Sequence, residues 1–144
     1  MIETDMLLAH VKETDWLKET AEAILRAIDS GKLGPICASR ESIHELYYLL
    51  TRTGTSLDDT LVRIGALTKI RNLNWLPTTT DTDLLALSLM STYKLSSIFD
   101  AYHAAACLLG DPDQTMLSTD SIYETIPRIK REEPREFTKR LSQM

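Results

Sequence analysis

Short strand-like segments alternate with longer helical segments along the chain, and this alternation constrains the fold more than any other feature. The expected strands are the residues around Ile2 and the segments 35–39, 73–77 and 115–119. Strands that are separated by helices must run parallel, because a tight hairpin cannot connect them. We therefore expect an α/β fold, a three-layer α/β/α sandwich with a mainly parallel sheet of four to five strands.

The expected helices begin at a Ser or Thr that precedes a helical pattern, which is the usual sequence sign of an N-cap. The predicted N-caps are Thr14, Ser39, Ser56, Thr80 and Ser97. Glycines mark the expected ends of the first, second and last of these helices: Gly31, Gly54 and Gly110. No repeat and no linker rich in Pro or Gly divides the chain, so we expect residues 1–144 to form a single domain.

Charge is distributed unevenly along the chain. The formal net charge is −5, but six basic and three acidic residues from Pro127 onward give this segment +3 and leave −8 on the rest. The net negative charge argues against nucleic-acid binding by bulk attraction. An acidic body with a basic C-terminal segment from about residue 127 can hold a metal ion in one place and contact phosphates or an acidic partner in another. A solvated C-terminal helix is the simpler interpretation of this segment.

Cysteine usage and hydropathy indicate the compartment. Cys37 and Cys107 lie in apolar segments without the spacing of metal ligands, so we expect buried thiols in a reducing environment. The first five residues are largely polar, and no apolar run approaches the roughly 20 residues that a membrane span requires. We therefore expect a soluble, cytoplasmic protein that does not contact a membrane.

Acidic residues follow the expected strands or open the helices beside them. In a parallel sheet the strands end at one edge, and the helices that return the chain begin at that edge. This rule brings together Glu3 and Asp5 after the first strand, Glu45 in a helix after the second, Asp100 at the start of the last helix, and Asp120 after the last strand. Carboxylates gathered in this way repel one another, and a divalent cation removes the repulsion. Oxygen ligands favour Mg²⁺ or Mn²⁺, and one or two such ions can promote hydrolysis of a phosphodiester bond.

Each of these acids also has a simpler interpretation. Asp100 lies three residues after Ser97, so the two side chains could form a capping box. Asp120 could begin a turn, and Glu45 could be a solvated helix residue. We favour metal ligation because all of these acids are predicted at one edge of the sheet.

Four further residues near this edge are given no catalytic role. Asp81 and Asp83 face the same edge, but their position after Thr80 is better explained by helix capping. His44 and His103 each lie near a proposed ligand, where a histidine can transfer a proton. A lone histidine beside a buried helix is more often a packing residue, and we interpret both in that way.

Four segments of the chain resemble, in order and spacing, the acidic motifs of PIN-domain nucleases, and in particular those of VapC-like toxins from toxin–antitoxin pairs. They read IETDMLLAHV, SRESIHELYYLL, FDAYHAAACLLG and TMLSTDSIYETIP. The resemblance covers nearly the whole chain. It implies a metal-binding and catalytic quartet made of the first-strand acid, Glu45, Asp100 and Asp120, with the hydroxyl of Thr119 supporting the last acid.

The first motif departs from the family pattern. The family usually reads Asp-Thr-Asn where this chain reads Glu3-Thr4-Asp5, so either acid can be the first-strand ligand. The two side chains would share one face of a strand. We favour Asp5, which is nearer to the expected strand end and has the shorter and stiffer side chain. The resemblance further implies RNA as substrate, Mg²⁺ or Mn²⁺ as cofactor, a homodimer, and inhibition by a small antitoxin protein.

Two other functions fit the same fold class. A Mg²⁺-binding signalling domain of receiver type would need an Asp at the end of the third strand and a Lys after a late one, but the chain reads NWLPTTTD and LSTDS at these places. An inactive interaction module would retain the acids only as helix caps. The acids favour a metal-dependent endoribonuclease, and the resemblance implies that it acts as the toxin of a toxin–antitoxin pair.

Overall fold

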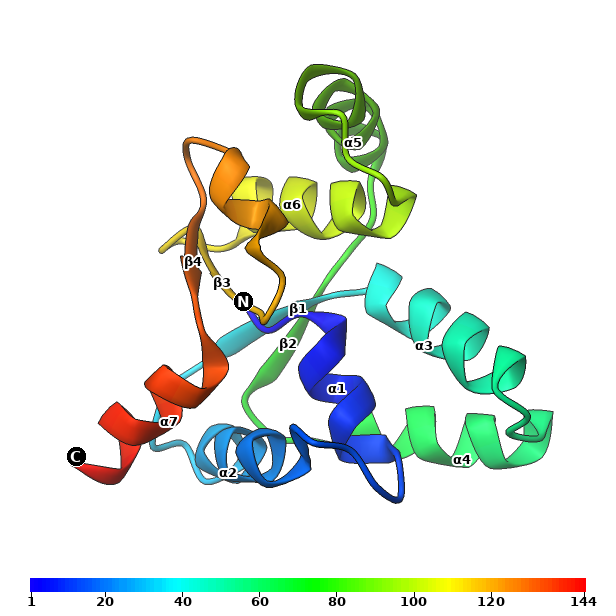
Figure 1. Ribbon diagram of the computed structural model, residues 1–144, viewed down its shortest axis with the longest axis vertical. Coiled ribbons are helices and arrows are strands. Elements are labelled where there is room, and N and C mark those ends of the chain that lie inside the picture. Colours follow the sequence, from blue (N-terminus) through cyan, green and yellow to red (C-terminus); the bar gives the residue numbers. More distant parts are fainter.

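Five parallel chain segments form the sheet in the computed structural model, which describes residues 1–144 (Figure 1). The regular strands are β1 (Ile36–Ser39), β2 (Leu73–Leu76), β3 (Thr115–Leu117) and β4 (Lys130–Glu132). β1 pairs with β2 and β3 pairs with β4, in both cases in parallel. Ile2 joins the two pairs through parallel bridges to Ala38 and Leu117. The expected parallel sheet is therefore confirmed, although its central strand is reduced to a single bridging residue.

Seven α-helices and one 3₁₀ helix surround the sheet. They are α1 (Thr4–Val11), α2 (Lys18–Asp29), α3 (Glu41–Arg52), α4 (Leu57–Leu67), α5 (Thr80–Tyr93), α6 (Ile98–Gly110), η1 (Ser121–Thr125) and α7 (Pro134–Ser142). In Figure 1, α5 and α6 lie on one side of the sheet, whereas α1, α2 and α4 lie on the other. This arrangement is the predicted three-layer sandwich.

Two apolar cores fill the space between these layers. Ile2 and Leu117 belong to the core beneath α1 and α2, whereas their chain neighbours Met1 and Met116 belong to the core beneath α5 and α6. Successive residues of an extended chain point to opposite faces, so each short segment supplies side chains to both cores. Burial on both faces explains why β1, β3 and the segment around Ile2 are mainly apolar without a clear polar alternation.

Two of the five predicted N-caps are confirmed. Ser56 Oγ accepts a hydrogen bond from the Asp59 amide (3.1 Å), and Ser97 Oγ accepts one from the Phe99 amide (3.2 Å). The N-caps of α2, α3 and α5 are Leu17, Arg40 and Thr79 in place of Thr14, Ser39 and Thr80. At α5 the shift has a clear cause, because Thr79 and Thr82 form a reciprocal capping box. Gly31 and Gly54 have φ angles of 82° and 99° and end α2 and α3 as expected, and Gly110 is the last residue of α6.

The N-terminal segment differs from the prediction. Glu3 is the N-cap of α1, with φ −97° and ψ 166°, and its side chain accepts a hydrogen bond from the Asp5 amide. Asp5 therefore lies in the first turn of a helix, and the expectation that Glu3 and Asp5 share one face of a strand is wrong. Acidic residues are favoured in a first helical turn, and the apolar residues Met6, Leu7 and Ala9 are buried by this helix.

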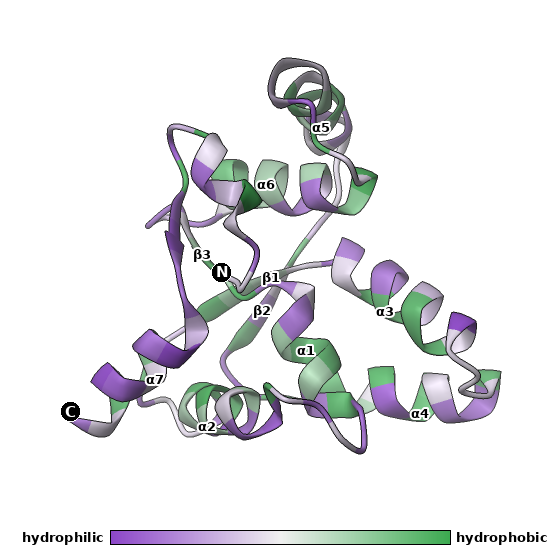
Figure 2. Ribbon diagram, viewed as in Figure 1, coloured by the Kyte–Doolittle hydropathy of each residue, from purple (hydrophilic) through white to green (hydrophobic).

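The basic C-terminal segment is also more than a solvated helix. Its first part forms β4, which Figure 2 shows almost entirely in the hydrophilic colour, and α7 then packs against α2. Charged residues are typical of an edge strand, where they discourage pairing with another chain. The Arg131 guanidinium donates a hydrogen bond to the Ser118 carbonyl (3.0 Å) and forms an ion pair with Glu124. β4 thereby supports the loop that follows β3.

Candidate active site

All five predicted acids line one cleft at the carboxyl ends of the strands. The lining residues are Glu3, Thr4, Asp5, Leu8, Glu45, Leu49, Asp100, Thr119 and Asp120. They come from the start of α1, from α3 and α6, and from the loop after β3. Five carboxyl groups thus meet in a cleft whose lining contains no Lys or Arg.

Glu3 is the most deeply buried of these acids, with 7% of its surface exposed. Its Oε2 accepts a hydrogen bond from Ser118 Oγ (3.2 Å), and its Oε1 lies 3.7 Å from His103 Nε2. Burial, followed by the negative charges of Asp5 and Glu45, raises the pKa of Glu3 well above its usual value. A buried carboxyl group beside two other acids gains more than an exposed one from a bound cation.

Asp5 is held by the loop after β3. Its Oδ2 accepts hydrogen bonds from the Thr119 amide (2.8 Å) and from Thr119 Oγ1 (2.7 Å), and its Oδ1 accepts one from the Met6 amide (2.8 Å). The expectation that Thr119 supports Asp120 is therefore wrong, because the Thr119 hydroxyl donates its hydrogen to Asp5 in the first turn of α1. Asp5 therefore links α1 to the loop after β3, and both of its carboxylate oxygens already accept hydrogen bonds from the protein.

This contact predicts a measurable loss of stability. Thr119→Val removes the hydroxyl that donates to a carboxylate, and hydrogen bonds to charged groups contribute about 1.5–3 kcal/mol. We expect the free energy of unfolding to fall by about 1.5 kcal/mol in urea titrations. Thr125→Val is the control, because the exposed Thr125 hydroxyl bonds only the Ile122 carbonyl within its own 3₁₀ helix. Equal effects of the two substitutions would show that Thr119 does not hold Asp5.

Asp120 lines the cleft and also begins a turn, as its simpler interpretation predicted. It is exposed at the edge of the cleft and is the N-cap of η1, where its Oδ1 accepts a hydrogen bond from the Ile122 amide (2.9 Å). Its own amide donates to Ser118 Oγ (3.0 Å). Ser118 is fully buried and also contacts Glu3, so it connects two acids of the cleft. Nothing in the sequence distinguishes Ser118, because serine is common between a strand and a turn.

Asp100 faces the cleft and does not cap its helix through a capping box. Ser97 accepts from the Phe99 amide, whereas Asp100 Oδ1 lies 3.5 Å from the Tyr123 hydroxyl, which donates to it. Burial raises the pKa of Asp100, and the charges of Asp120 and Glu45 raise it further. The simpler interpretation of Asp100 as a capping residue is therefore not supported by its contacts.

Glu45 lies in the second turn of α3 and is paired with a histidine. Its Oε1 accepts a hydrogen bond from His103 Nε2 (2.9 Å). Burial acts to raise the pKa of Glu45, but the hydrogen bond from His103 opposes it, and the pKa of Glu45 is lowered overall. The ligand atoms of Glu3, Glu45 and His103 lie within 4.8 Å of one another.

His103 was interpreted from the sequence as a packing residue, and that interpretation missed its contacts with the acids. The side chain is fully buried, but it bonds polar groups of α1 and α3. One signal was available, because His103 follows Asp100 by three residues and so lies on the same helix face.

The remaining polar residues near this edge are engaged elsewhere. His44 is exposed, and its Nδ1 lies 2.9 Å from Glu41 Oε2. It therefore does not pack in the core, and it does not line the cleft. Asp83 accepts a hydrogen bond from the Tyr102 hydroxyl (2.5 Å). Asp81 and Asp83 lie in the first turn of α5, outside the lining of the cleft.

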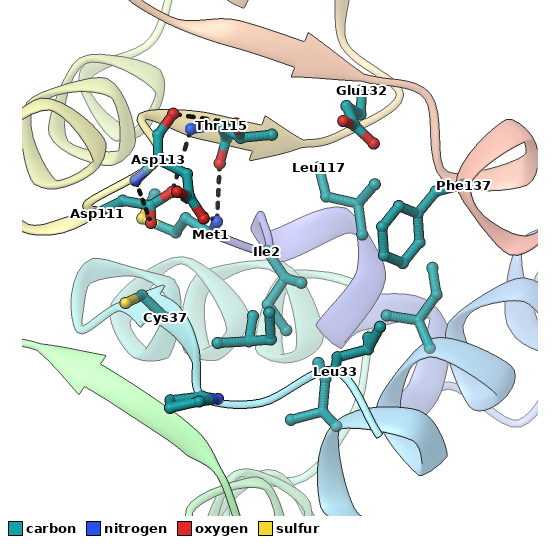
Figure 3. A pocket seen from close by; sticks show the side chains of 14 residues that line it. Met1, Ile2, Leu33, Cys37, Asp111, Asp113, Thr115, Leu117, Glu132 and Phe137 are labelled. Atoms are coloured by element: carbon teal, nitrogen blue, oxygen red, sulfur yellow. Dashed lines mark hydrogen bonds and ion pairs between the residues drawn. The ribbon is translucent and has the colours of Figure 1, made fainter. Parts of the chain in front are cut away.

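A second, mainly apolar cavity lies beside the amino ends of β1 and β3 (Figure 3). The amino group of Met1 is already bonded there, to Asp111 Oδ2 (3.0 Å) and to the Thr115 carbonyl (2.7 Å). Burial, assisted by Asp111, raises the pKa of the Cys37 thiol, which keeps it protonated and weakly nucleophilic. Burial also raises the pKa of Cys107, to about 12. Both cysteines are free thiols, but only Cys107 is buried as expected, whereas Cys37 is half-buried.

The donor set of the cleft fits a divalent cation. Its side chains offer carboxylate oxygens, which are the ligands that Mg²⁺ and Mn²⁺ prefer. A bound cation would also offset the repulsion that raises the pKa values of Glu3 and Asp100.

Comparison with known families gives one match for this chain. The family model described as PIN domain matches residues 1–129, a range that contains every acid of the cleft. A search of curated proteins finds no match. β4 and α7 lie beyond the matched range, yet β4 is paired with β3 in the sheet. None of the helices has the length and apolarity that crossing a membrane would require.

Proposed function

The chain belongs to the PIN domain family, and we propose on this basis that it is a metal-dependent endoribonuclease that hydrolyses phosphodiester bonds of RNA. PIN domains are generally metal-dependent nucleases. The acidic cleft carries the proposal for this chain, because carboxyl groups from three helices and one loop meet there without a basic side chain in the lining. A structural role alone would not require five acids in one cleft with no Lys or Arg in its lining.

Glu3, Glu45, Asp100 and Asp120 are the residues we assign to metal binding. Glu3 replaces Asp5 as the preferred acid of the first motif. Glu3 is buried and repelled by its neighbours, whereas both oxygens of Asp5 accept hydrogen bonds from the protein. Asp5 then acts with Thr119 to fix the loop after β3.

The chemistry proposed for the cleft follows from these positions. A bound Mg²⁺ or Mn²⁺ ion lowers the pKa of a water molecule and stabilises charge on phosphate oxygens. Glu3 and Glu45, on the buried side of the cleft, are positioned to hold the ion. Asp120 lies exposed at the edge, and its Oδ2 has no partner within the protein. This oxygen is available as a ligand of the cation.

A fluorogenic RNA assay tests the proposed function. We expect cleavage in the presence of Mg²⁺ or Mn²⁺, complete loss with EDTA, and recovery when excess metal is returned. A single-stranded DNA of the same sequence serves as the substrate control. Cleavage that persists in EDTA, or the absence of cleavage by a protein that demonstrably binds Mn²⁺, would contradict the proposal; the second result would indicate an inactive interaction module.

We further propose that the protein is a cytoplasmic VapC-like toxin that forms a homodimer and is inhibited by a small antitoxin. The resemblance of the four acidic segments supports this role. Exposed apolar side chains on α3 and α4 are available for partner chains: Tyr47, Tyr48, Leu57, Leu61 and Val62.

Light scattering of the purified protein tests whether it forms a dimer. Induced expression should arrest bacterial growth, and co-expression of a small adjacent gene should relieve the arrest; normal growth with active enzyme would contradict the toxin role.

A further inference from the structure

His103 occupies an unusual position for a histidine on an otherwise apolar helix. Its side chain is fully buried, and its Nε2 lies 2.9 Å from Glu45 Oε1 and 3.0 Å from Thr4 Oγ1. Its other ring nitrogen, Nδ1, is buried without any hydrogen-bond partner. The two nitrogens therefore have opposite environments, and this difference determines where the proton lies.

The neighbours of Nε2 are both acceptors. The hydroxyl of Thr4 donates its only hydrogen to Ser42 Oγ (2.9 Å), so Thr4 Oγ1 can only accept a bond from His103. An ionised carboxylate likewise can only accept. Nε2 must then carry a hydrogen, which it shares between Glu45 and Thr4.

The environment of Nδ1 excludes the other protonation states. A proton on Nδ1, in the neutral ring or in the imidazolium, would be a buried N–H donor with no acceptor, and such orphaned donors are rare and costly. A bare lone pair on Nδ1 avoids this cost. The contacts therefore favour the neutral tautomer with its hydrogen on Nε2.

The same reasoning separates His103 from the metal ligands. Coordination through Nε2 would need a lone pair on that atom and would move the hydrogen to Nδ1. Histidines that bind metals almost always donate their second N–H to an acceptor, and His103 has none on that side. The short distances to Glu3 and Glu45 thus describe a hydrogen-bond donor beside the ligands and not a further ligand.

We infer that His103 is a positioning residue, whose Nε2–H fixes Glu45 Oε1 and Thr4 Oγ1 and leaves Glu45 Oε2 free for the cation. The inference rests on the proposed function, in which Glu45 is a ligand. Through these bonds α6 is tied to α1 and, by way of Ser42, to α3. Glu45 is held in one orientation before the cation arrives, and less conformational freedom is lost on binding.

The tautomer can be read in the metal-free protein by long-range ¹H–¹⁵N NMR of the imidazole rings. We expect His103 to show a protonated Nε2 and an unprotonated Nδ1, and to keep this pattern when Mg²⁺ is added. His10 and His44, which are partly or fully exposed, supply reference signals in the same spectrum. A proton on Nδ1, or transfer of the proton to Nδ1 when Mg²⁺ is added, would overturn the inference. This experiment needs no nuclease activity, so its failure is distinct from failure of the proposed function.

Two amide substitutions test the consequence for metal binding. Glutamine places its N–H₂ group near the position of Nε2, whereas asparagine places it near Nδ1. We expect His103→Asn to weaken Mn²⁺ binding by about 10–100-fold, as is usual for the loss of a group that orients a ligand, and His103→Gln to retain affinity within about threefold. Mn²⁺ titration followed by electron paramagnetic resonance measures both, and urea titration measures the stability of each variant. Equal losses of affinity in the two variants at equal stability would contradict a positioning role, and the NMR result decides the question if either variant fails to fold.

Discussion

Replacing Glu3 by glutamine is expected to reduce RNA cleavage by on the order of 1000-fold, equivalent to about 4 kcal/mol of transition-state stabilisation, and to stabilise the metal-free protein. Glutamine keeps the size of the side chain and an oxygen that can accept from Ser118 Oγ. It removes the charge that burial, Asp5 and Glu45 disfavour. Activity should therefore fall because the cation loses a ligand, while folding without the cation improves because a repelling carboxylate is lost.

Single-turnover cleavage of a fluorogenic RNA measures the first effect, and thermal unfolding in EDTA measures the second. Asp5→Asn is the matched control, because it removes one charge two residues away. We expect it to lower stability, since the bonds from Thr119 to Asp5 are weakened, and to leave Mn²⁺ affinity within about tenfold of the original protein. If Asp5→Asn instead abolished metal binding while Glu3→Gln retained it, Asp5 would be the ligand, as its position in the sequence first suggested.

The sheet and the cleft were predictable because they follow from connectivity. Strands separated by helices must be parallel, and residues after parallel strands meet at one edge whatever the loops do. This rule brought Glu45, Asp100 and Asp120 together from positions far apart in the chain. It needs only approximate element boundaries, and so it was insensitive to the misplaced N-caps.

Features that depend on tertiary contacts were not predictable. β4 has the sequence Lys-Arg-Glu and no apolar pattern, because an edge strand can be held by backbone hydrogen bonds alone. Thr119 stands next to Asp120 in the sequence but bonds Asp5, and only the path of the loop decides between them. His103 lies in an alanine-rich helix whose sequence shows burial but not the acids that α1 and α3 bring to it.

The metal-free protein is expected to lose stability as the pH rises from about 4.5 towards neutrality, and Mg²⁺ is expected to restore it. The folded-state pKa of Glu3 is raised well above its ordinary value of 4.5. A carboxyl group with a raised pKa binds its proton more tightly in the folded protein than in the unfolded one. Its contribution to the free energy of unfolding is therefore complete below the unfolded-state pKa, and it is lost as the pH rises through the folded-state pKa. Asp100, whose pKa is raised from 3.8, acts in the same direction. The pKa of Glu45 is lowered from 4.5, so this residue stabilises the folded protein as the pH rises. That gain is complete near pH 4.5, and it does not cancel the loss of stability at higher pH.

A loss of about 1.4 kcal/mol is expected for each unit by which the pKa of Glu3 is raised. Mg²⁺ at 100 times its dissociation constant adds about 2.7 kcal/mol, which corresponds to an increase in Tm of roughly 5–10 °C for a chain of this length. Thermal unfolding between pH 4.5 and 8, in EDTA and in Mg²⁺, measures both effects. Glu3→Gln should flatten the pH dependence in EDTA and abolish most of the gain from Mg²⁺, because one substitution removes both the titrating group and the ligand. A stability in EDTA that stays constant or rises over this range would mean that the carboxyl groups of the cleft do not repel one another, and the physical reason for a cation at this site would be lost.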